Sequence, residues 1–174
     1  EAQSFETLIK AAKILKEFNL VEWIILGDGR WKKNLNKLIE KNNLNNEIKM
    51  INAVPPSKVK PFLNCADALY LSLKNNETFK KTIPGKLSTY MFSEKPIIAS
   101  ISGEANKIIT EAKCGFTSEA EDYKGLVNNV IKFIELSKVE KNQLGINGKV
   151  YVSKFFEKKK ILKKLEEEIN NLAI

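Results

Sequence analysis

The chain alternates between two spacings of hydrophobic residues, one typical of helices and one typical of buried strands. Phe5 to Phe18 carries apolar residues three and four positions apart, which predicts an amphipathic helix. Val21 to Leu26 is a short apolar run that ends at Gly27-Asp28-Gly29, which predicts a buried strand followed by a turn. This pairing of a helix with a short strand recurs along the chain.

The following elements continue the same alternation. A polar loop is expected from Lys74 to Lys81, and the chain from Asp122 onward is expected to be helical, with interruptions at Gly145 and Asn147-Gly148. The other patterns predict helices near Trp31–Lys41, Ser57–Cys65, Pro84–Ser93 and Glu104–Lys113, and strands near Ile48–Ile51, Ala68–Leu71, Pro96–Ser100 and Gly115–Ser118.

Short apolar strands that alternate with helices are typical of the α/β class with a doubly wound parallel sheet, a Rossmann-like architecture. In such sheets, ligands bind at the carboxyl ends of the strands. A parallel unit of this kind normally has a strand before its first helix, whereas this chain opens with the helix at Phe5. We therefore expect that a central strand is missing upstream of Glu1 and that a gap between strands stands in its place.

The composition is that of one globular domain spanning residues 1–174. The chain is 43% hydrophobic and 29% charged, which is enough to bury a core, and no linker rich in Pro, Gly or Ser divides it. The formal net charge of +8 could indicate a nucleic-acid partner, but the Lys residues are scattered among Asn and Glu. No nucleic-acid-binding motif is present, and few aromatic residues are grouped for base stacking. We expect a solvated basic surface and no nucleic-acid partner.

Missing residue types exclude several chemistries. The sequence contains no His, which excludes Ser-His-Asp and Cys-His mechanisms and the usual zinc sites. Cys65 and Cys114 lack the close spacing of a metal or redox motif, so we expect reduced thiols and no metal. No apolar run approaches the roughly 20 residues of a membrane span, and the start lacks the layout of a signal peptide. A cytoplasmic location is therefore expected.

Two turns could hold a phosphate. Gly27-Asp28-Gly29 follows a strand, but Lys32 stands where the dinucleotide fingerprint has its third glycine, so a plain tight turn is an equally good interpretation. The second turn, Thr82 to Leu87, places Pro84 at the start of a helix, followed by Gly85, which has no side chain to keep an anion from the free amides. Taken alone, this turn also fits an ordinary helix that begins at a proline.

The second turn belongs to a longer pattern. Pro84-Gly85-Lys86-Leu87-Ser88-Thr89-Tyr90-Met91 leads into Lys95-Pro96-Ile97-Ile98-Ala99-Ser100, then Gly103-Glu104 and Ala112-Lys113-Cys114-Gly115. This succession resembles the carboxyl-terminal, nucleotide-sugar-binding domain of family 4 retaining glycosyltransferases of GT-B fold. It is similar in particular to bacterial fucosaminyltransferases of surface-polysaccharide assembly, and the resemblance covers nearly the whole chain.

The resemblance implies a nucleotide sugar, commonly a UDP-sugar, as the ligand. It implies retaining transfer of the sugar to a glycan or lipid-linked acceptor, without a metal or other cofactor. In such enzymes an N-terminal domain supplies the acceptor site. We therefore expect this chain to be the donor-binding part of a larger enzyme, and to bind a donor without turning it over alone.

The resemblance also assigns roles to residues of this chain. The start of the helix would face the diphosphate of the donor, the next helical turn its ribose, and the loops after the first two strands its base, while Glu77 is a candidate sugar contact. The implied positions are Thr82, Pro84, Gly85, Lys86 and Leu87 for the diphosphate, Thr89 for the ribose, and Gly27, Gly29, Val54 and Pro55 for the base pocket.

The sequence departs from the family at three positions. The family has two Glu residues spaced by seven, and these positions fall here on Lys81 and Thr89. A carboxylate can accept bonds from both ribose hydroxyls, whereas Thr offers one oxygen. Glu94 stands where the family prefers Gly, at a helix end where a left-handed residue is common. These departures favour the alternative of a degenerate, non-catalytic Rossmann-like module that binds a nucleotide or a protein partner.

The last predicted helix has an uneven distribution of charge. Lys158-Lys159-Lys160 and Lys163-Lys164 precede Glu166-Glu167-Glu168, an order that opposes the helix dipole. The pattern fits a solvated face with Lys–Glu pairs spaced by four, and it also fits a surface that meets anionic lipid. The second interpretation would add a peripheral contact at the inner face of a membrane.

Overall fold

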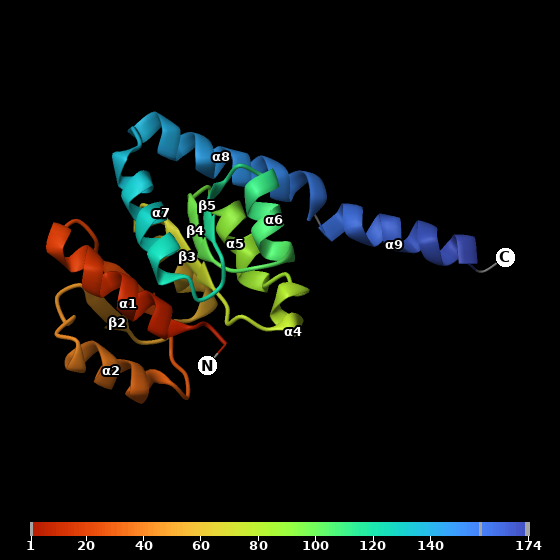
Figure 1. Cartoon of the computed structure of the whole chain (residues 1–174). Helices are drawn as coiled ribbons and strands as arrows, with labels where there is room; N and C mark the ends of the chain where they lie inside the picture. The colour runs from red at the N-terminus through yellow and green to blue at the C-terminus, as the bar shows by residue number, and fades with distance from the viewer. Residues whose placement is uncertain (1, 157, 173–174) are drawn as a thin grey trace.

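The computed structural model describes residues 2–156 and 158–172, and it has the α/β architecture expected from the sequence (Figure 1). Its strands are β1 (Trp23–Leu26), β2 (Ile48–Ile51), β3 (Leu69–Ser72), β4 (Ile97–Ser100) and β5 (Gly115–Ser118). Its helices are α1 (Phe5–Leu15), α2 (Lys32–Lys41), α3 (Val59–Cys65), α4 (Glu77–Lys80), α5 (Gly85–Phe92), α6 (Glu104–Glu111), α7 (Tyr123–Glu135), α8 (Lys138–Phe155) and α9 (Lys158–Leu172). Short 3₁₀ turns, η1 (Lys16–Phe18) and η2 (Pro56–Lys58), extend α1 and precede α3.

The paired strands are all parallel, but they form two sheets. β1 pairs with β2, and β4 lies between β3 and β5. No backbone ladder joins β1 to β3 within residues 2–156 and 158–172. Their side chains do meet, since the rings of Trp23 and Tyr70 pack edge to face with centroids 5.4 Å apart. The expected break in the sheet is therefore present, and it lies between β1 and β3.

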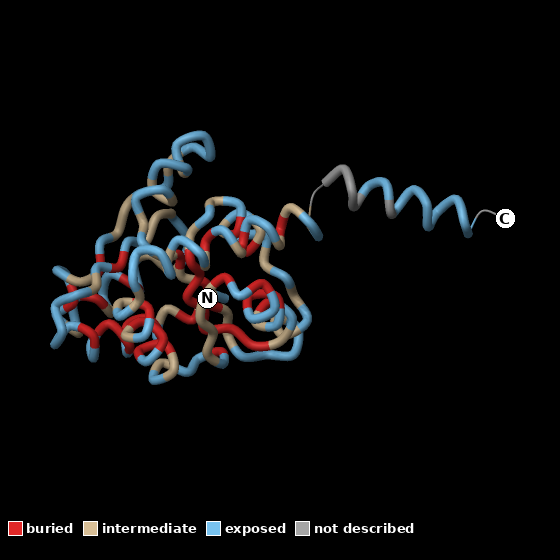
Figure 2. The backbone as a smooth tube through the Cα atoms, turned by 90° about the horizontal axis from the view of Figure 1, so that it is seen from above, coloured by how far each residue is buried: buried red, intermediate tan, exposed pale blue. Residues whose placement is uncertain are grey.

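Helices cover both faces of the three-stranded sheet, as expected for a doubly wound fold. Successive strand residues point to opposite faces, so Ile97 and Ile98 enter different cores. α1 and α7 cover the Ile98 face, while α5, α6 and α8 cover the Ile97 face. Figure 2 shows the buried positions gathered in the interior of the domain, with exposed positions around them. The two cores hold the ends of the strands in place.

The sequence pattern predicted a polar loop from Lys74 to Lys81, but part of this segment is helical. It contains the short helix α4, which begins because the Asn76 side chain accepts a hydrogen bond from the Phe79 N–H at 2.8 Å. Asn is a favoured cap because its side-chain oxygen satisfies an amide that the helix leaves free. The prediction missed this helix because one turn is too short to show a hydrophobic period.

The predicted interruptions at Gly145 and Asn147-Gly148 are also wrong, because α8 is continuous from Lys138 to Phe155. The break lies before it, where Ser137 caps α8 in a capping box with Glu140. The glycines serve packing instead. A Cβ on Gly145 would overlap the carbonyl oxygen of Glu94, so this glycine lets α8 approach the end of α5.

Glu94 adopts the left-handed conformation expected at this helix end, with φ of 56°. A non-glycine residue is strained there. Its carboxylate forms an ion pair with the ammonium of Lys149 on α8. This ion pair offsets part of the backbone strain, because a glycine at this position would have no side chain to pair with Lys149.

α9 extends away from the body of the domain (Figure 1). Lys163 and Glu167 pair at 3.8 Å on this helix, as the solvated interpretation of its charges expects. Side chains at 158–161 and 164 lie outside what the structure describes, so the cationic run is not placed. The apolar side chains Leu162, Leu165, Ile169 and Leu172 are exposed.

Candidate functional site

The first turn of α5 leaves backbone amides accessible. Pro84 is its N-cap, with φ of −64°, the value that the proline ring imposes. Gly85 and Lys86 follow as exposed residues, and their N–H groups open the helix, where no helical carbonyl can accept them. A Cβ on Gly85 would meet no atom within 4 Å, so the surface beside these amides is open. Such a helix start attracts anions.

Leu87 holds this turn in place. Its side chain is 1% exposed and belongs to the core shared with α6 and α8. Its N–H donates to the carbonyl of Pro84 at 2.9 Å. Of the positions that the resemblance assigned to the diphosphate, Leu87 therefore supports the helix from below, while Gly85 and Lys86 face outward.

Lys86 is the cation of this turn. Burial of its ammonium lowers the pKa of Lys86 below its ordinary value, although the residue as a whole is exposed. Partial loss of water disfavours the charged form of Lys86 and strengthens the attraction between its ammonium and any anion that approaches. An anion bound at the start of α5 would therefore be held by amides and by Lys86.

Two threonines flank the turn. Thr82 is half-buried, and its hydroxyl donates to the carbonyl of Thr78 at 2.7 Å, which ties it to α4. Thr89 is exposed one turn into α5, and its hydroxyl lies 3.4 Å from the carbonyl of Gly85. The Thr89 hydroxyl donates its proton to that carbonyl, so its oxygen remains able to accept a hydrogen bond from a ligand.

Glu77, the candidate sugar contact, begins α4. Its carboxylate is exposed and pairs with Lys80 at 2.7 Å. This hydrogen bond and the attraction between the two charges raise the pKa of Lys80. Glu77 would exchange this partner for a ligand at little cost, because exposed pairs contribute little to stability.

The candidate base pocket lies at the carboxyl ends of β1 and β2. The Gly27 N–H donates to the carbonyl of Ile51 at 3.0 Å, which joins the two strand ends. Lys32 then bridges the two loops, donating to Asn52 at 2.6 Å and pairing with Asp28 at 3.7 Å. The turn and the loop that the resemblance assigned to one pocket are therefore neighbours. The loop continues through Val54, half-buried, and Pro55, exposed, and Gly29 lies in the turn.

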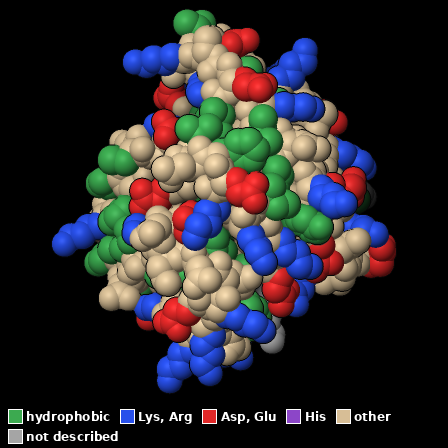
Figure 3. All heavy atoms as spheres, turned by 60° about the vertical axis from the view of Figure 1, so that its left-hand side comes forward, with side chains coloured by type: hydrophobic (Ala, Val, Ile, Leu, Met, Phe, Trp, Pro, Cys, Tyr) green, Lys and Arg blue, Asp and Glu red, His purple; other side chains and the backbone are tan. Residues whose placement is uncertain are grey.

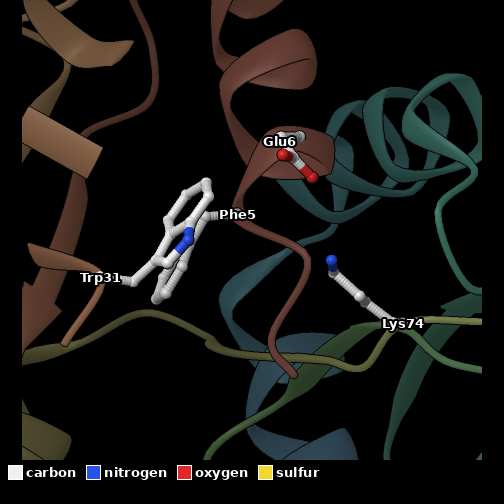
Figure 4. Close-up of a pocket in the computed structure, with 4 residues that line it drawn as sticks. All are labelled: Phe5, Glu6, Trp31 and Lys74. Atoms are coloured by element: carbon white, nitrogen blue, oxygen red, sulfur yellow. The ribbon is translucent and has the colours of Figure 1, made fainter. Parts of the chain in front are cut away.

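A small hollow links the two sheets at this edge (Figure 4). It is lined by Phe5, Glu6, Trp31 and Lys74. Phe5 stacks on Trp31, with centroids 6.4 Å apart, and Glu6 and Lys74 point toward each other across the opening. Trp31 follows β1 and Lys74 follows β3, so the carboxyl ends of both sheets open on the same side.

The contact between Lys32 and Asn52 was not predicted from the sequence. Lys32 was noticed only as the residue replacing a glycine. A lysine shortly after one strand end and an asparagine directly after the next are a weak signal, because many surface residues share that placement. Their contact becomes visible only when the parallel pairing of β1 and β2 is known.

Within the described residues, the structure shows neither a metal cluster nor a membrane span. No group of three or more His, Cys, Asp or Glu side chains there could hold a metal ion. None of the helices described combines the length and apolarity that crossing a bilayer requires. Cys114 is buried and Cys65 exposed, and they form no disulfide. Figure 3 shows both signs of charge interspersed on the face that carries α1, not one basic patch.

The family described as Glycosyl transferases group 1 matches residues 1–151 of this chain. A curated relative is the Escherichia coli protein WcaL, named as a colanic acid biosynthesis glycosyltransferase. It is 26% identical over 138 residues, which cover 78% of this chain and 34% of the relative. The chain thus spans about a third of the length of the curated relatives it matches.

Solved structures share the fold. The Anabaena protein HepE, in complex with UDP-glucose, superposes with a TM-score of 0.79 at 20% identity, covering 97% of this chain and 45% of HepE. The C-terminal domain of LpcC, a group 1 family glycosyl transferase from Francisella tularensis, gives 0.71 at 18% identity, covering 90% of this chain and 81% of that domain. These likenesses confirm the Rossmann-like α/β fold of GT-B glycosyltransferases.

Proposed function

The chain belongs to the glycosyl transferases group 1 family, and we propose that it is the donor-binding domain of a retaining glycosyltransferase. The proposed donor is a UDP-sugar, and the proposed acceptor is a glycan or a lipid-linked glycan of surface-polysaccharide synthesis. The resemblance to fucosaminyltransferases supports this finer assignment. An N-terminal domain of the same enzyme would supply the acceptor site, at the cytoplasmic side of the membrane, where a peripheral contact would bring a lipid-linked acceptor within reach.

The observation that carries the proposal is the open, cationic start of α5. Exposed Gly85, the amide of Lys86 and its partly desolvated ammonium combine helix-end amides with a charge, which is what a diphosphate requires. The same groups would stabilise the negative charge that grows on the departing UDP during transfer. Pro84 and Thr82 complete the proposed diphosphate site.

The remaining roles follow the resemblance in sequence. We propose that Thr89 meets the ribose and that Glu77 meets the sugar. The base would lie at the turn and loop joined by Lys32 and Asn52, where the pocket positions are Gly27, Gly29, Val54 and Pro55. The proposed scheme uses no metal, because the helix-end amides and Lys86 would stabilise the negative charge of the diphosphate.

The fold of HepE in complex with UDP-glucose supports a UDP-sugar as the ligand. The name of WcaL, a colanic acid biosynthesis glycosyltransferase, supports a polysaccharide as the destination of the sugar. Both statements concern those proteins, and they come to this chain as parts of the proposal.

Thr89 favours a second candidate function, a degenerate module that binds a nucleotide or a protein without transferring a sugar. Its single hydroxyl stands where the family has a carboxylate. The two candidates differ in donor affinity, because a degenerate site need not hold a UDP-sugar more tightly than UDP.

The proposal is tested by calorimetric titration of the chain with UDP and then with several UDP-sugars. We expect saturable binding of UDP and tighter binding of one UDP-sugar. Binding of UDP with no preference among the sugars would support the degenerate module. No heat of binding at millimolar UDP would overturn the donor site.

Thr89→Glu is the companion variant, with Ser88→Glu as its matched control. A carboxylate at position 89 is expected to tighten UDP binding by roughly tenfold, because it accepts both ribose hydroxyls in charge-assisted bonds. The control adds the same charge one position away without that geometry. Equal effects of the two variants would show that Thr89 does not meet the ribose.

A further inference from the structure

The last residue of α4, Lys80, lies directly over Gly103. Gly103 caps α6 with φ of 81°, a conformation that favours glycine. A Cβ at this position would overlap the backbone carbonyl of Lys80, and the carbon and Cα of Lys80 lie beside that oxygen. The contact is with backbone, so no rotation of a side chain could relieve it.

The turn that carries Gly103 is held firmly from beneath. Ser102 is 6% exposed, donates to the carboxylate of Glu119, and accepts from the Ala120 N–H at 2.9 Å. Ile101 and Ala105 on either side are buried. The Gly103 turn is therefore a fixed surface, and a clash would displace the Lys80 side of the contact.

Lys80 lies four positions before Pro84, the cap of α5. The carbonyl of Phe79 accepts from the Thr82 N–H at 3.1 Å, and that of Thr78 accepts from the Thr82 hydroxyl. Thr82 is thus bonded to α4 itself. α5 has separate anchors in Leu87 and Met91, each 1% exposed. A shift of Lys80 would therefore move Thr82 while the amides of α5 stay in place.

We propose that Gly103 is a positioning residue for the donor site. By letting Lys80 lie against the turn between β4 and α6, it sets the position of Thr82 before the start of α5, where the Thr82 hydroxyl would exchange its bond to the Thr78 carbonyl for one to a donor phosphate. Glu119, in the loop after β5, assists, because its charge attracts Lys80. This inference rests on the proposed donor function and adds a residue that touches neither UDP nor sugar.

The test compares Gly103→Ala with Gly145→Ala. Both variants place a Cβ against a backbone carbonyl at one end of the α4–α5 segment, Lys80 in the first case and Glu94 in the second. We expect Gly103→Ala to weaken UDP binding by roughly tenfold or more, because small displacements of binding groups are costly. Gly145→Ala should change it by less than about twofold, since distant sites act independently.

Hydrogen exchange of residues 78–86 supplies a readout that simple loss of stability would not move. Gly103→Ala should speed exchange in this segment at a temperature where both variants are folded, and Gly145→Ala should not. Glu119→Gln serves if Gly103→Ala fails to fold, with UDP binding weakened by roughly threefold through the lost attraction on Lys80.

The outcomes separate this inference from the proposed function. If the unmodified chain does not bind UDP, the donor function fails and Gly103 positions nothing. If the unmodified chain binds UDP and Gly103→Ala binds it equally well, only the positioning role is overturned. Equal losses of UDP affinity in Gly103→Ala and Gly145→Ala would also overturn it, because both would then act through stability.

Discussion

The two ends of α5 are built in opposite ways. At its start, Gly85 and Lys86 are exposed and the amides have no helical acceptor. At its other end, the Glu94 carbonyl lies against Gly145 and the Glu94 carboxylate pairs with Lys149. The difference shows that one helix can be open and polar at its start while its other end is fixed against α8.

The comparison also separates two departures from the family. Glu94 stands in place of a glycine, and the neighbouring α8 supplies Lys149 as a partner for it. Thr89 stands in place of a carboxylate, and its hydroxyl lies near a carbonyl of its own helix. The change at the packed end has a visible compensation, whereas the change at the proposed ligand end would alter what the proposed site can hold.

The largest expected effect is on the packed end. Gly145→Ala should lower the free energy of unfolding by about 2–3 kcal/mol, because the new Cβ overlaps the Glu94 carbonyl and the helices must separate. Denaturant unfolding measures this change. Gly125→Ala is the control, since the atoms nearest to its Cβ would be side-chain atoms of Asp122 and Ser118. Equal losses in both variants would mean that the α5–α8 contact is not special.

At the open end, Lys86→Met should weaken UDP binding by roughly tenfold or more, because losing a hydrogen bond to a charged group costs about 1.5–3 kcal/mol. The free energy of unfolding should change by less than about 0.5 kcal/mol. Calorimetry and denaturant unfolding measure the two quantities. Lys81→Met removes an exposed charge from the preceding segment and is the control.

Lys86 also predicts a pH dependence of UDP binding. The ammonium must be protonated to hold a phosphate, and burial lowers the pKa of Lys86. Affinity should therefore decline as pH rises through this lowered pKa, at a lower pH than an ordinary lysine would require. Lys86→Arg should flatten the decline, since arginine keeps its charge. An unchanged profile in Lys86→Arg would exclude Lys86 as the titrating group.

The packed side of α5 should respond to alkali through stability. Cys114 is fully buried beneath Gly148, and burial raises its pKa from 9.0 to about 12. In the unfolded chain the Cys114 thiol loses its proton at a lower pH than in the folded chain. Its contribution to the free energy of unfolding is therefore fully present below about pH 9 and is lost as pH rises toward 12. The slope should approach about 1.4 kcal/mol per pH unit.

Unfolding titrations at several alkaline pH values measure this slope. Cys114→Ala should remove the contribution of the Cys114 thiol from the measured slope, while Cys65→Ala, at the exposed thiol, should leave the slope unchanged. A slope that survives in Cys114→Ala would belong to other groups.

The smallest effect is expected at Glu94. Glu94→Gly relieves a left-handed residue, worth about 1–2 kcal/mol, and loses an exposed ion pair worth about 0.2–1 kcal/mol, so the net gain in stability is about 0–1.8 kcal/mol. Thermal unfolding measures it. Lys149→Ala should destabilise the original chain slightly and have no effect once Glu94→Gly is present. If Lys149→Ala lowered the stability in both backgrounds, Lys149 would stabilise the chain through something other than its ion pair with Glu94.

Much of the fold could be predicted because the relevant signals are local. The strand at Ile48–Ile51 and the strand at Gly115–Ser118 have the predicted bounds, since short apolar runs between turns are distinctive. α4 was missed because a single capped turn is too short to show a hydrophobic period. α8 was wrongly divided because the low helix propensity of glycine is an average tendency that packing can override. Tertiary packing against Glu94 outweighed that preference.

The amino-acid sequence by itself determined the order and type of the elements, the Pro-Gly-Lys start of α5 and the left-handed turn at Glu94. These features depend on residues close together in the chain. Only the tertiary structure decided that Lys149 pairs with Glu94, that Lys32 reaches Asn52, and that Gly103 bears the backbone of Lys80. Such contacts join residues that parallel pairing and helix packing bring together from distant segments, and no local pattern records them.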